Sequence, residues 1–391
     1  MGIFRIGLRQ HIGGAALAIV AKGDVVKKGQ VIGELGDGLG ARVHSSVLGR
    51  VLRICDDFVD IEADAVQTDE FVQIEDFDSH LEAVRLAGIV GAGGAGFPSH
   101  VKFAVDLDGG TFILNAAECE PELRHNVLAL REQAGLIVRG VKYAMGMVNA
   151  GRAFIAVKPK HNAMLINLIK LIKDEENIEI KFLSDTYPVG DERVIVRELM
   201  GITLEAGQLP ITAGVVVSNV ETIKRVAEAI ELRKPVITKD FTVAGRLQGE
   251  GKVYLDEPIG APVSTYIDDC GGALEPHGEI LIGGPFTGTS GSMDSVITKT
   301  TGGIFIAMPF PDDASKFGIL ACECGAGEDR LKEIVAGMGG NIVASAMCKR
   351  MVEVNGRYRC DQPGNCPGQA EAVMKLRSAG ADAVLVGSCE D

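Results

Sequence analysis

Apolar and polar residues alternate over short distances in the first part of the chain, residues 1–76. Apolar runs such as those within 23–32 and 43–51 are brief and are separated by glycine turns. Short runs bounded by turn residues are typical of β-strands joined in hairpins. The pattern therefore predicts a small all-β module at the start of the chain.

Residues 77–235 are organised differently, because helical and strand-like patterns alternate. A long helical periodicity covers 123–148, and a strand is expected at 153–157, followed by a helix at 163–173. A further strand is expected at 178–183. Such alternation predicts an α/β layer.

The rest of the chain divides at a linker rich in proline and aspartate, residues 309–313. Residues 236–310 combine strand-like runs and glycine turns with one short helix expected near 263–270. Residues 315–391 alternate strands and helices, which predicts a small α/β unit with an overall α/β multidomain architecture. The elements expected in that unit are strands at 317–321, 342–346 and 383–387 and helices at 328–338 and 369–379.

Composition limits the function classes. A net charge of −14 counts against binding to nucleic acid. No apolar run reaches the ~18–20 residues needed to span a bilayer, and the faint signal-peptide pattern at 13–21 runs directly into a hairpin pattern. We therefore expect a cytoplasmic protein without membrane insertion, for which peripheral association with a membrane stays open. Six of the nine cysteines lie between residues 322 and 389, and this clustering suggests redox or metal chemistry.

The segment 91–102, Gly-Ala-Gly-Gly-Ala-Gly-Phe-Pro-Ser-His-Val-Lys, is the clearest candidate site. Glycines let backbone N–H groups approach a ligand with no side chain in the way. Pro98 suits the first turn of a helix, whose N-terminus would favour a phosphate, and Lys102 follows. The loop therefore predicts a phosphate cradle for a nucleotide or a flavin.

A Rossmann dinucleotide site is the first alternative, because Gly91, Gly93 and Gly96 have the G-x-G-x-x-G spacing. Two features argue against it. The helix expected after the loop has only about ten residues, which is short for that fold. The turn Glu118-Cys-Glu-Pro121 has no role in a Rossmann site.

The glycine loop and the segment Asn115-Ala-Ala-Glu-Cys-Glu-Pro121 resemble the flavin site of the NADH-oxidising subunit of respiratory complex I. They are more similar still to the RnfC family of the Rnf electron-transport complex. Two later segments, Tyr187-Pro-Val-Gly-Asp-Glu192 and Asn219-Val-Glu-Thr222, agree with these families in order and spacing. The resemblance implies four domains: an N-terminal barrel-sandwich hybrid (1–76) of biotinyl/lipoyl type without a carrier lysine, an α/β FMN- and NADH-binding domain (77–235), a β-grasp, SLBB-like domain (236–310) and a cysteine-rich α/β redox domain (315–391).

The resemblance also implies a set of cofactor-binding residues. FMN would lie on the glycine backbone, with Lys102 near its phosphate or reduced ring and Thr222 near the phosphate. Phe97 would stack on the nicotinamide or adenine of NADH, and Glu120 and Glu192 would bind the dinucleotide. The complete implied set is Gly91, Gly93, Gly94, Gly96, Phe97, Lys102, Asn115, Glu120, Tyr187, Gly190, Asp191, Glu192, Asn219 and Thr222.

Electrons that reach a flavin must also leave it. The families that this sequence resembles carry iron–sulfur cysteines at C-x-x-C-x-x-C spacing, and this sequence has no such run. The C-terminal cysteines could instead form a thiol–disulfide relay, an irregularly spaced iron–sulfur cluster or a structural zinc site, and we assign no metal ligands among them. The candidates for the redox role are Cys322, Cys324, Cys360, Cys366 and Cys389.

The tail segment 362–369, Gln-Pro-Gly-Asn-Cys-Pro-Gly-Gln, resembles RnfC-like electron-transfer proteins associated with clostridial D-proline reductase. That resemblance implies D-proline reductase as the partner. Because such systems use selenocysteine, we hypothesise that Asp391 precedes a UGA codon, which would give a Cys389-x-x-Sec pair. An in-frame continuation after that codon would support this hypothesis.

The favoured interpretation is an FMN-dependent NADH dehydrogenase that passes electrons through its C-terminal cysteines to a partner reductase. The alternative is a non-enzymatic adaptor of a redox complex, bearing zinc or a cluster.

Overall fold

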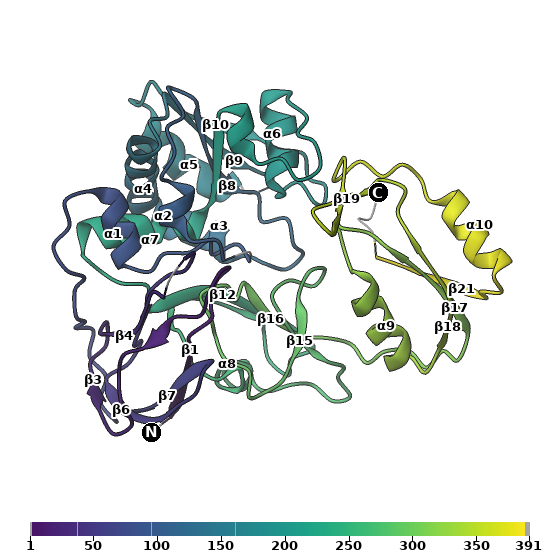
Figure 1. Cartoon of the computed structure of the whole chain (residues 1–391), viewed down its shortest axis with the longest axis horizontal. Coiled ribbons are helices and arrows are strands. Elements are labelled where there is room, and N and C mark those ends of the chain that lie inside the picture. The colour runs from purple at the N-terminus through teal and green to yellow at the C-terminus, as the bar shows by residue number, and fades with distance from the viewer. Residues whose placement is uncertain (1, 37, 95, 161, 388–391) are drawn as a thin grey trace.

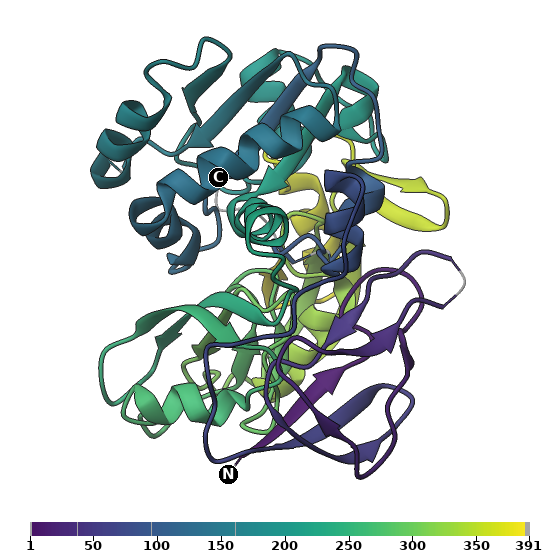
Figure 2. The same cartoon turned by 90° about the vertical axis from the view of Figure 1, so that its left-hand side faces the viewer.

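The computed structural model describes residues 2–36, 38–94, 96–160 and 162–387. We use four names below: the N-terminal module (2–76), the second domain (77–235), the third domain (236–310) and the cysteine domain (315–387). The second domain lies across the top of the molecule, with the N-terminal module and the third domain side by side beneath it (Figure 2). The cysteine domain lies to one side (Figure 1).

The N-terminal module is a sandwich of two antiparallel sheets, as the short apolar runs predict. Alternate residues of its strands, among them Ile6, Val51 and Ile61, are fully or almost fully buried between the sheets. One sheet has the order β1 (Ile3–Gly7), β7 (Phe58–Ala63), β6 (Gly49–Ile54), β3 (Val25–Val26), and the other β2 (Leu17–Ala18), β4 (Val31–Glu34), β5 (Val43–His44).

The second domain is built on a parallel four-stranded sheet with helices on both faces. Successive residues of its strands enter opposite cores, so that Phe112 and Leu114 pack in one apolar cluster and Ile113 in another. The strand order is β10 (Ile178–Phe182), β9 (Arg152–Val157), β8 (Thr111–Ala116), β11 (Val215–Asn219). The helices are α1 (His80–Leu86), α2 (Ser99–Lys102), α3 (His125–Glu132), α4 (Ala134–Met147), α5 (Asn162–Ile172), α6 (Glu192–Met200) and α7 (Val220–Glu231), with a 3-10 turn, η1, at Pro210–Ala213.

The structure refines one helix prediction for this domain and contradicts another. The helical periodicity at 123–148 is confirmed, but it is divided between two helices, because Gln133 leaves the helical conformation, with φ −124° and ψ 24°. The helix after the glycine loop, α2, has four residues instead of about ten. Pro98 is the residue before α2, and the chain then turns through Asp108 and Gly109, both with positive φ, into β8.

The third domain is a mixed five-stranded sheet covered by one helix. Val263 and Ile267 of the helix share an apolar cluster with Phe241 and Val243, which belong to the second strand of the sheet. The strand order is β13 (Lys252–Pro258), β12 (Thr238–Gly245), β16 (Gly303–Ile306), β14 (Ile280–Ile282), β15 (Thr289–Gly291), and the helix is α8 (Val263–Asp269). The β-grasp relationship implied by the sequence stays a prediction.

A buried ionic network joins the second and third domains. Lys224 of α7 donates to Asp240 of β12 at 2.8 Å, and Arg225 donates to the same carboxylate at 2.9 Å. Asp256 of β13 accepts from both cations, at 2.9 and 2.6 Å. Because α7 carries Asn219 and Thr222 at its start, this network fixes the helix that the sequence places at the flavin phosphate.

The cysteine domain is a parallel three-stranded sheet whose strand ends carry cysteines. Cys322 follows β17 and Cys348 follows β18, at the same edge of the sheet. The hairpin of β19 (Met351–Val354) and β20 (Arg357–Cys360) was not predicted from the sequence. The sheet order is β18 (Asn341–Met347), β17 (Lys316–Ala321), β21 (Ala383–Val386), with helices α9 (Glu328–Gly337) and α10 (Ala370–Ser378).

In the part of the chain that the structure describes, no helix combines the length and the apolar character needed to cross a membrane.

Candidate functional site

The glycine loop presents bare backbone toward open space. Gly94 has φ +110°, a conformation that favours glycine, and a Cβ added there would meet no atom within 4 Å. The Gly91 N–H donates to the carbonyl of Phe97 at 2.9 Å and closes the loop. Its other side is anchored to the N-terminal module, because the Ile12 N–H donates to the Gly96 carbonyl at 3.1 Å.

The loop lies against the N-terminus of α7. Asn219 is the N-cap residue, and its Oδ1 accepts from the Glu221 N–H at 2.8 Å. The Ala92 N–H donates to Thr222 Oγ1 at 2.9 Å, and a Cβ on Gly93 would lie 3.5 Å from the Asn219 side chain. A twelve-residue helix directs its positive end here, which suits a phosphate.

Gly190 joins the loop region to the neighbouring segment. Asn115 Nδ2, at the carboxyl end of β8, donates to the Gly190 carbonyl at 3.0 Å. A Cβ at Gly190 would lie 2.7 Å from Cys119 Sγ, so only glycine fits. Asp191 caps α6, and Lys102 forms an ion pair with Glu192 at 2.5 Å.

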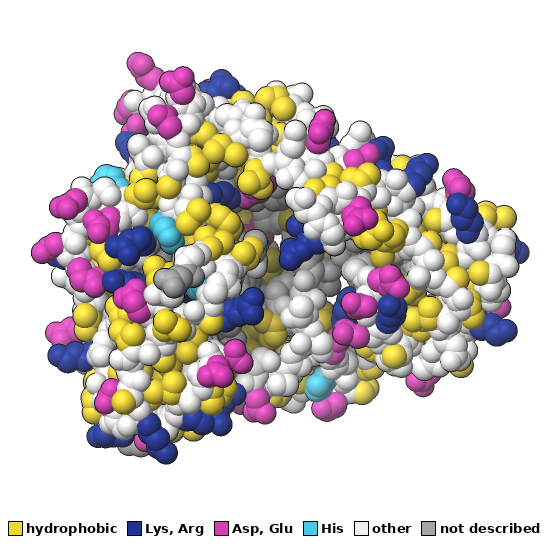
Figure 3. Space-filling view, viewed as in Figure 1, with side chains coloured by type: hydrophobic (Ala, Val, Ile, Leu, Met, Phe, Trp, Pro, Cys, Tyr) yellow, Lys and Arg dark blue, Asp and Glu magenta, His cyan; other side chains and the backbone are white. Residues whose placement is uncertain are grey.

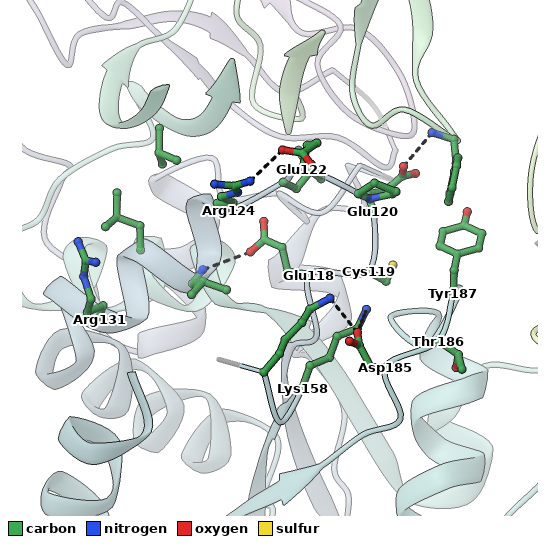
Figure 4. Close-up of a pocket in the computed structure, with 17 residues that line it drawn as sticks. Glu118, Cys119, Glu120, Glu122, Arg124, Arg131, Lys158, Asp185, Thr186 and Tyr187 are labelled. Atoms are coloured by element: carbon green, nitrogen blue, oxygen red, sulfur yellow. Dashed lines mark hydrogen bonds and ion pairs between the residues drawn. The ribbon is translucent and has the colours of Figure 1, made fainter. Parts of the chain in front are cut away.

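A pocket of about 890 Å³ opens at the carboxyl ends of β8, β9 and β10 (Figure 4), and we call it the strand-end pocket. It is distinct from the glycine loop, which does not line it. On the face shown in Figure 3 the molecule is hollowed between the second, third and cysteine domains. Its lining includes Glu118, Cys119, Lys158, Asp185, Tyr187 and Phe286.

Glu118 is the buried acid of this pocket, and the sequence suggested a role for it only in the rejected Rossmann alternative, as a ribose-binding acid. It has φ +44°, and its side chain is 1% exposed. Burial raises the pKa of Glu118 to about 7, although the backbone N–H of Val127 donates to it at 3.2 Å. His125 lies 3.4 Å away, and burial lowers its pKa to about 3.

Glu120 is engaged within the protein. Its carboxylate accepts from the backbone N–H groups of Phe286 and Thr287, at 2.9 and 3.1 Å, and from the Thr287 hydroxyl at 2.5 Å. Phe286 also meets Tyr187 edge to face, with ring centroids 4.7 Å apart. The turn between β14 and β15 is thereby held over the strand-end pocket.

Five cysteines gather at the edge of the cysteine domain, and we call them the cysteine cluster: Cys322, Cys324, Cys348, Cys360 and Cys366. Cys322, Cys324 and Cys348 are buried together, against Cys366 and Tyr187. A hydrogen bond with Cys324 lowers the pKa of Cys322, and the same contact raises the pKa of Cys324 to about 12. Cys324 interacts with Cys360 as well.

The described cysteines are all free thiols. Within the described residues, no three His, Cys, Asp or Glu side chains are arranged to hold a metal ion. Gln369 Nε2 donates to Cys348 Sγ at 3.0 Å and lies 3.9 Å from Cys366 Sγ. Cys389, the fifth predicted redox cysteine, lies outside the described residues.

Arg193 docks the cysteine domain on the second domain. It donates to the Cys360 carbonyl at 2.8 Å and to Glu323 at 3.1 Å. Gly364 packs beside Pro188, where an added Cβ would lie 3.1 Å from the proline ring. Tyr187 lines the strand-end pocket and also packs against the cysteine cluster, so one side chain contacts both.

The structure brings most of the predicted residues together. In the glycine loop, Gly93 lies against Asn219 and the neighbouring Ala92 N–H donates to Thr222. Asn115 donates to Gly190, and Lys102 pairs with Glu192, two residues further along. Phe97 does not line the strand-end pocket. Sequence reasoning missed three groups: Glu118, Lys158 and Arg193. Of these, only Glu118 could have been singled out from the sequence, since it belongs to the Glu-Cys-Glu-Pro motif.

Family models match two parts of the chain. Residues 2–75 match the RnfC barrel sandwich hybrid domain, and residues 84–228 match the Nuo51 FMN-binding domain of complex I. The fold and the site thus define a chain in which an RnfC-type sandwich precedes an FMN-binding domain.

Comparison with individual proteins narrows this class. The chain is 34% identical, over 318 residues, to the C subunit of the Na⁺-translocating ferredoxin:NAD⁺ oxidoreductase complex of Acetobacterium woodii, covering 76% of this chain and 72% of that protein. The C subunit of the proton-translocating complex of Clostridium ljungdahlii is 34% identical, over 76% of this chain and 69% of its own length. The chain therefore belongs to the RnfC family, which confirms the resemblance seen in the sequence.

Two further similarities cover less of the matched protein. The cobalamin reductase PduS of Salmonella typhimurium is 39% identical over 59% of this chain, which spans 50% of that reductase. The structure of an NAD⁺-reducing [NiFe]-hydrogenase in the air-oxidised state has a TM-score of 0.50 to this chain at 21% sequence identity. The match covers 60% of this chain and 47% of the hydrogenase chain. At this identity the likeness shows the fold alone.

Proposed function

We propose that the protein is an FMN-dependent oxidoreductase that accepts hydride from NADH and passes electrons through its C-terminal cysteines to a partner reductase. The observation that carries this proposal is the position of Tyr187. It lines the strand-end pocket, beside the residues predicted to hold FMN, and packs against the cysteine cluster.

The residues present fit FMN. Gly94 leaves its side of the loop open, and the N-terminus of α7, with Asn219 and Thr222, offers a phosphate site. Asn115 supplies an amide for the polar edge of the ring, and Lys102 supplies a cation. Bound FMN would supply hydride acceptance from NADH and release of electrons to the next carrier.

The cysteine cluster supports a thiol–disulfide exit. A disulfide between two of its sulfurs would take up two electrons and two protons to give two thiols. The lowered pKa of Cys322 favours its thiolate, the form that attacks a disulfide. An iron–sulfur cluster involving Cys389 is the competing exit, and metal content distinguishes the two.

The identity of the acceptor rests on sequence resemblance alone. Residues 362–369 support D-proline reductase as the partner, in the cytoplasm. Adding purified D-proline reductase to the NADH-reduced protein tests this. Re-oxidation of the flavin that depends on D-proline would support the assignment, and an unchanged rate would contradict it.

Anoxic reconstitution tests the proposed function. The purified protein is incubated with FMN, freed of excess cofactor and titrated with NADH while its visible spectrum is recorded. The proposal predicts stoichiometric FMN and bleaching by NADH. A colourless protein that contains stoichiometric zinc and takes up no FMN would favour the adaptor alternative.

A further inference from the structure

We propose that Lys299 is a positioning residue for the glycine loop, because its buried ammonium joins three domains behind that loop and so controls how tightly the loop binds FMN. The inference rests on the proposed function for the identity of the ligand. Lys299 lies in the third domain, in the segment between β15 and β16. None of the residues predicted to bind FMN belongs to this segment.

The Lys299 side chain connects domains. It is 2% exposed, and its Nζ donates to the carbonyl of Gly88 in the second domain at 2.7 Å and to the carbonyl of Arg42 in the N-terminal module at 2.6 Å. The backbone N–H of Lys299 donates to Gln10 Oε1, also in the N-terminal module, at 2.9 Å. One lysine thus links the second domain to both domains that lie beneath it (Figure 2).

The carbonyl that Lys299 holds belongs to the residue from which the chain enters the glycine loop. Shortly after Gly88, the Ile89 carbonyl accepts from the Ser99 N–H at 3.0 Å, and the Gly91 N–H donates to the far side of the loop. These bonds close the neck of the loop. A Cβ added at Gly88 would lie 2.4 Å from the Arg42 carbonyl oxygen, so the N-terminal module packs directly on this side of the neck.

The other end of the loop is supported by the same two domains. A Cβ added at Gly96 would lie 3.1 Å from Thr300 Cγ2 and 3.1 Å from His11 Cα, so both residues lie close against the loop. The Ile12 N–H donates to the Gly96 carbonyl at 3.1 Å. The backbone N–H groups that would meet a phosphate are therefore positioned by the N-terminal module and the third domain as well as by α7.

The Lys299 ammonium is bound by carbonyl groups without a counterion. Burial lowers the pKa of Lys299 to about 7, and among the described residues no acidic side chain offsets this effect. His44 and His11 face it from the N-terminal module, and burial lowers the pKa of both, so that they are uncharged near pH 7. The nearby Arg42 guanidinium is already paired with Glu34 and Glu75, each at 2.9 Å.

The protonation state of Lys299 should therefore affect the loop. Hydrogen bonds from a charged donor are roughly twice as strong as those between neutral groups. Below pH 7 the ammonium holds the Gly88 and Arg42 carbonyls firmly, and above pH 7 the neutral amine holds them more weakly. FMN affinity should fall about tenfold between roughly pH 6.5 and pH 9. The phosphate of FMN titrates near pH 6 whatever the variant, so its effect cancels when variants are compared.

Two measurements on the whole chain test the inference. One is the Kd for FMN, from a fluorescence titration at several pH values, and the other is the hydrogen exchange of the Gly91 and Gly96 amides in the FMN-free protein. Lys299→Met keeps the length of the side chain and removes the donor. It should weaken FMN binding about tenfold at low pH, remove the pH dependence and speed the exchange of both amides several-fold.

Two further variants complete the test. Gln10→Met breaks the bond to the Lys299 backbone but leaves the ammonium in place, so it should weaken FMN binding and speed the exchange while keeping the pH dependence. Lys252→Met is the matched control, because Lys252 is an exposed lysine of the same domain whose Nζ also donates to a backbone carbonyl, that of Asp269, at 2.7 Å. It should change neither measurement.

The inference is overturned if Lys299→Met binds FMN as tightly as the wild type, or with the same pH dependence, since Lys299 would then only fill space. If Lys299→Met does not fold, a wild-type Kd that is constant with pH, or unchanged exchange in Gln10→Met, overturns it instead. Failure of the proposed function looks different: the wild type would take up no FMN, or NADH would not reduce it, and amide exchange in the FMN-free protein would still decide the role of Lys299.

Discussion

Replacing Glu118 by glutamine should change how the stability of the protein depends on pH. The Glu118 carboxyl is buried, and burial raises its pKa from 4.5 to about 7. A group whose pKa is raised by folding stabilises the native state fully below pH 4.5, and this contribution is lost as the pH rises through 7. Glutamine has nearly the same shape and does not ionise. The variant should therefore gain stability relative to the wild type between pH 5 and pH 8.

The size of this gain follows from the pKa. The rise from 4.5 to about 7 corresponds to about 3 kcal/mol of unfolding free energy, an upper value because buried sites relax. His125 titrates in the opposite sense, since its pKa is lowered to about 3 and its contribution is gained as the pH rises. Because both proteins retain His125, its effect largely cancels in their difference.

Urea unfolding followed by circular dichroism at pH 5, 6, 7 and 8 measures the difference between wild type and Glu118→Gln. Glu122→Gln is the matched control, because Glu122 lies in the same turn but is half exposed. A difference that does not change with pH would refute the assignment of Glu118 as a buried, proton-binding acid. So would an equal pH dependence in the control.

Three other changes test the framework around the site. Arg193→Met should free the cysteine domain and speed proteolysis of the 309–313 linker several-fold, whereas Arg139→Met, which breaks an exposed ion pair, should not. Asp240→Asn leaves buried cations without their carboxylate and should lower the unfolding free energy by about 3–5 kcal/mol. The exposed Asp269→Asn should cost far less, and equal losses would contradict the network. Gly94→Ala forces a side chain to φ +110° and should weaken FMN binding about tenfold in a fluorescence titration, and unchanged affinity would remove the loop from the site.

The strands of this fold could be predicted from the sequence because each one is marked by its own apolar run. Parallel strands buried on both faces are nearly continuous apolar runs, and β9 and β10 begin and end within one residue of the predicted strands. The helix boundaries were harder to predict from the sequence. The conformational break at Gln133 leaves no mark in the periodicity, and the brevity of α2 depends on the turn that leads into β8.

The candidate site likewise has a part that the sequence predicts and a part that it does not. Glycines, a capping asparagine and an amide at a strand end can be matched to a known motif, and the structure brings Gly93, Asn115 and Asn219 together. The contacts between domains could not be read from the sequence. The bonds from Glu120 to the turn at Phe286, and from Arg193 to Cys360, join residues more than a hundred positions apart. Neither pair has a local pattern that would reveal it.

The central claim is that electrons enter at the glycine loop and cross Tyr187 to the cysteine cluster. Anoxic titration with NADH, combined with alkylation of thiols and mass spectrometry, tests it most directly. After mild oxidation, NADH should bleach the FMN of the reconstituted protein and expose new thiols among Cys322, Cys324 and Cys360, while FMN-free protein exposes none. Bleaching of the flavin without any new thiol would contradict the thiol exit, and an oxidised flavin that NADH leaves unchanged would contradict the account as a whole.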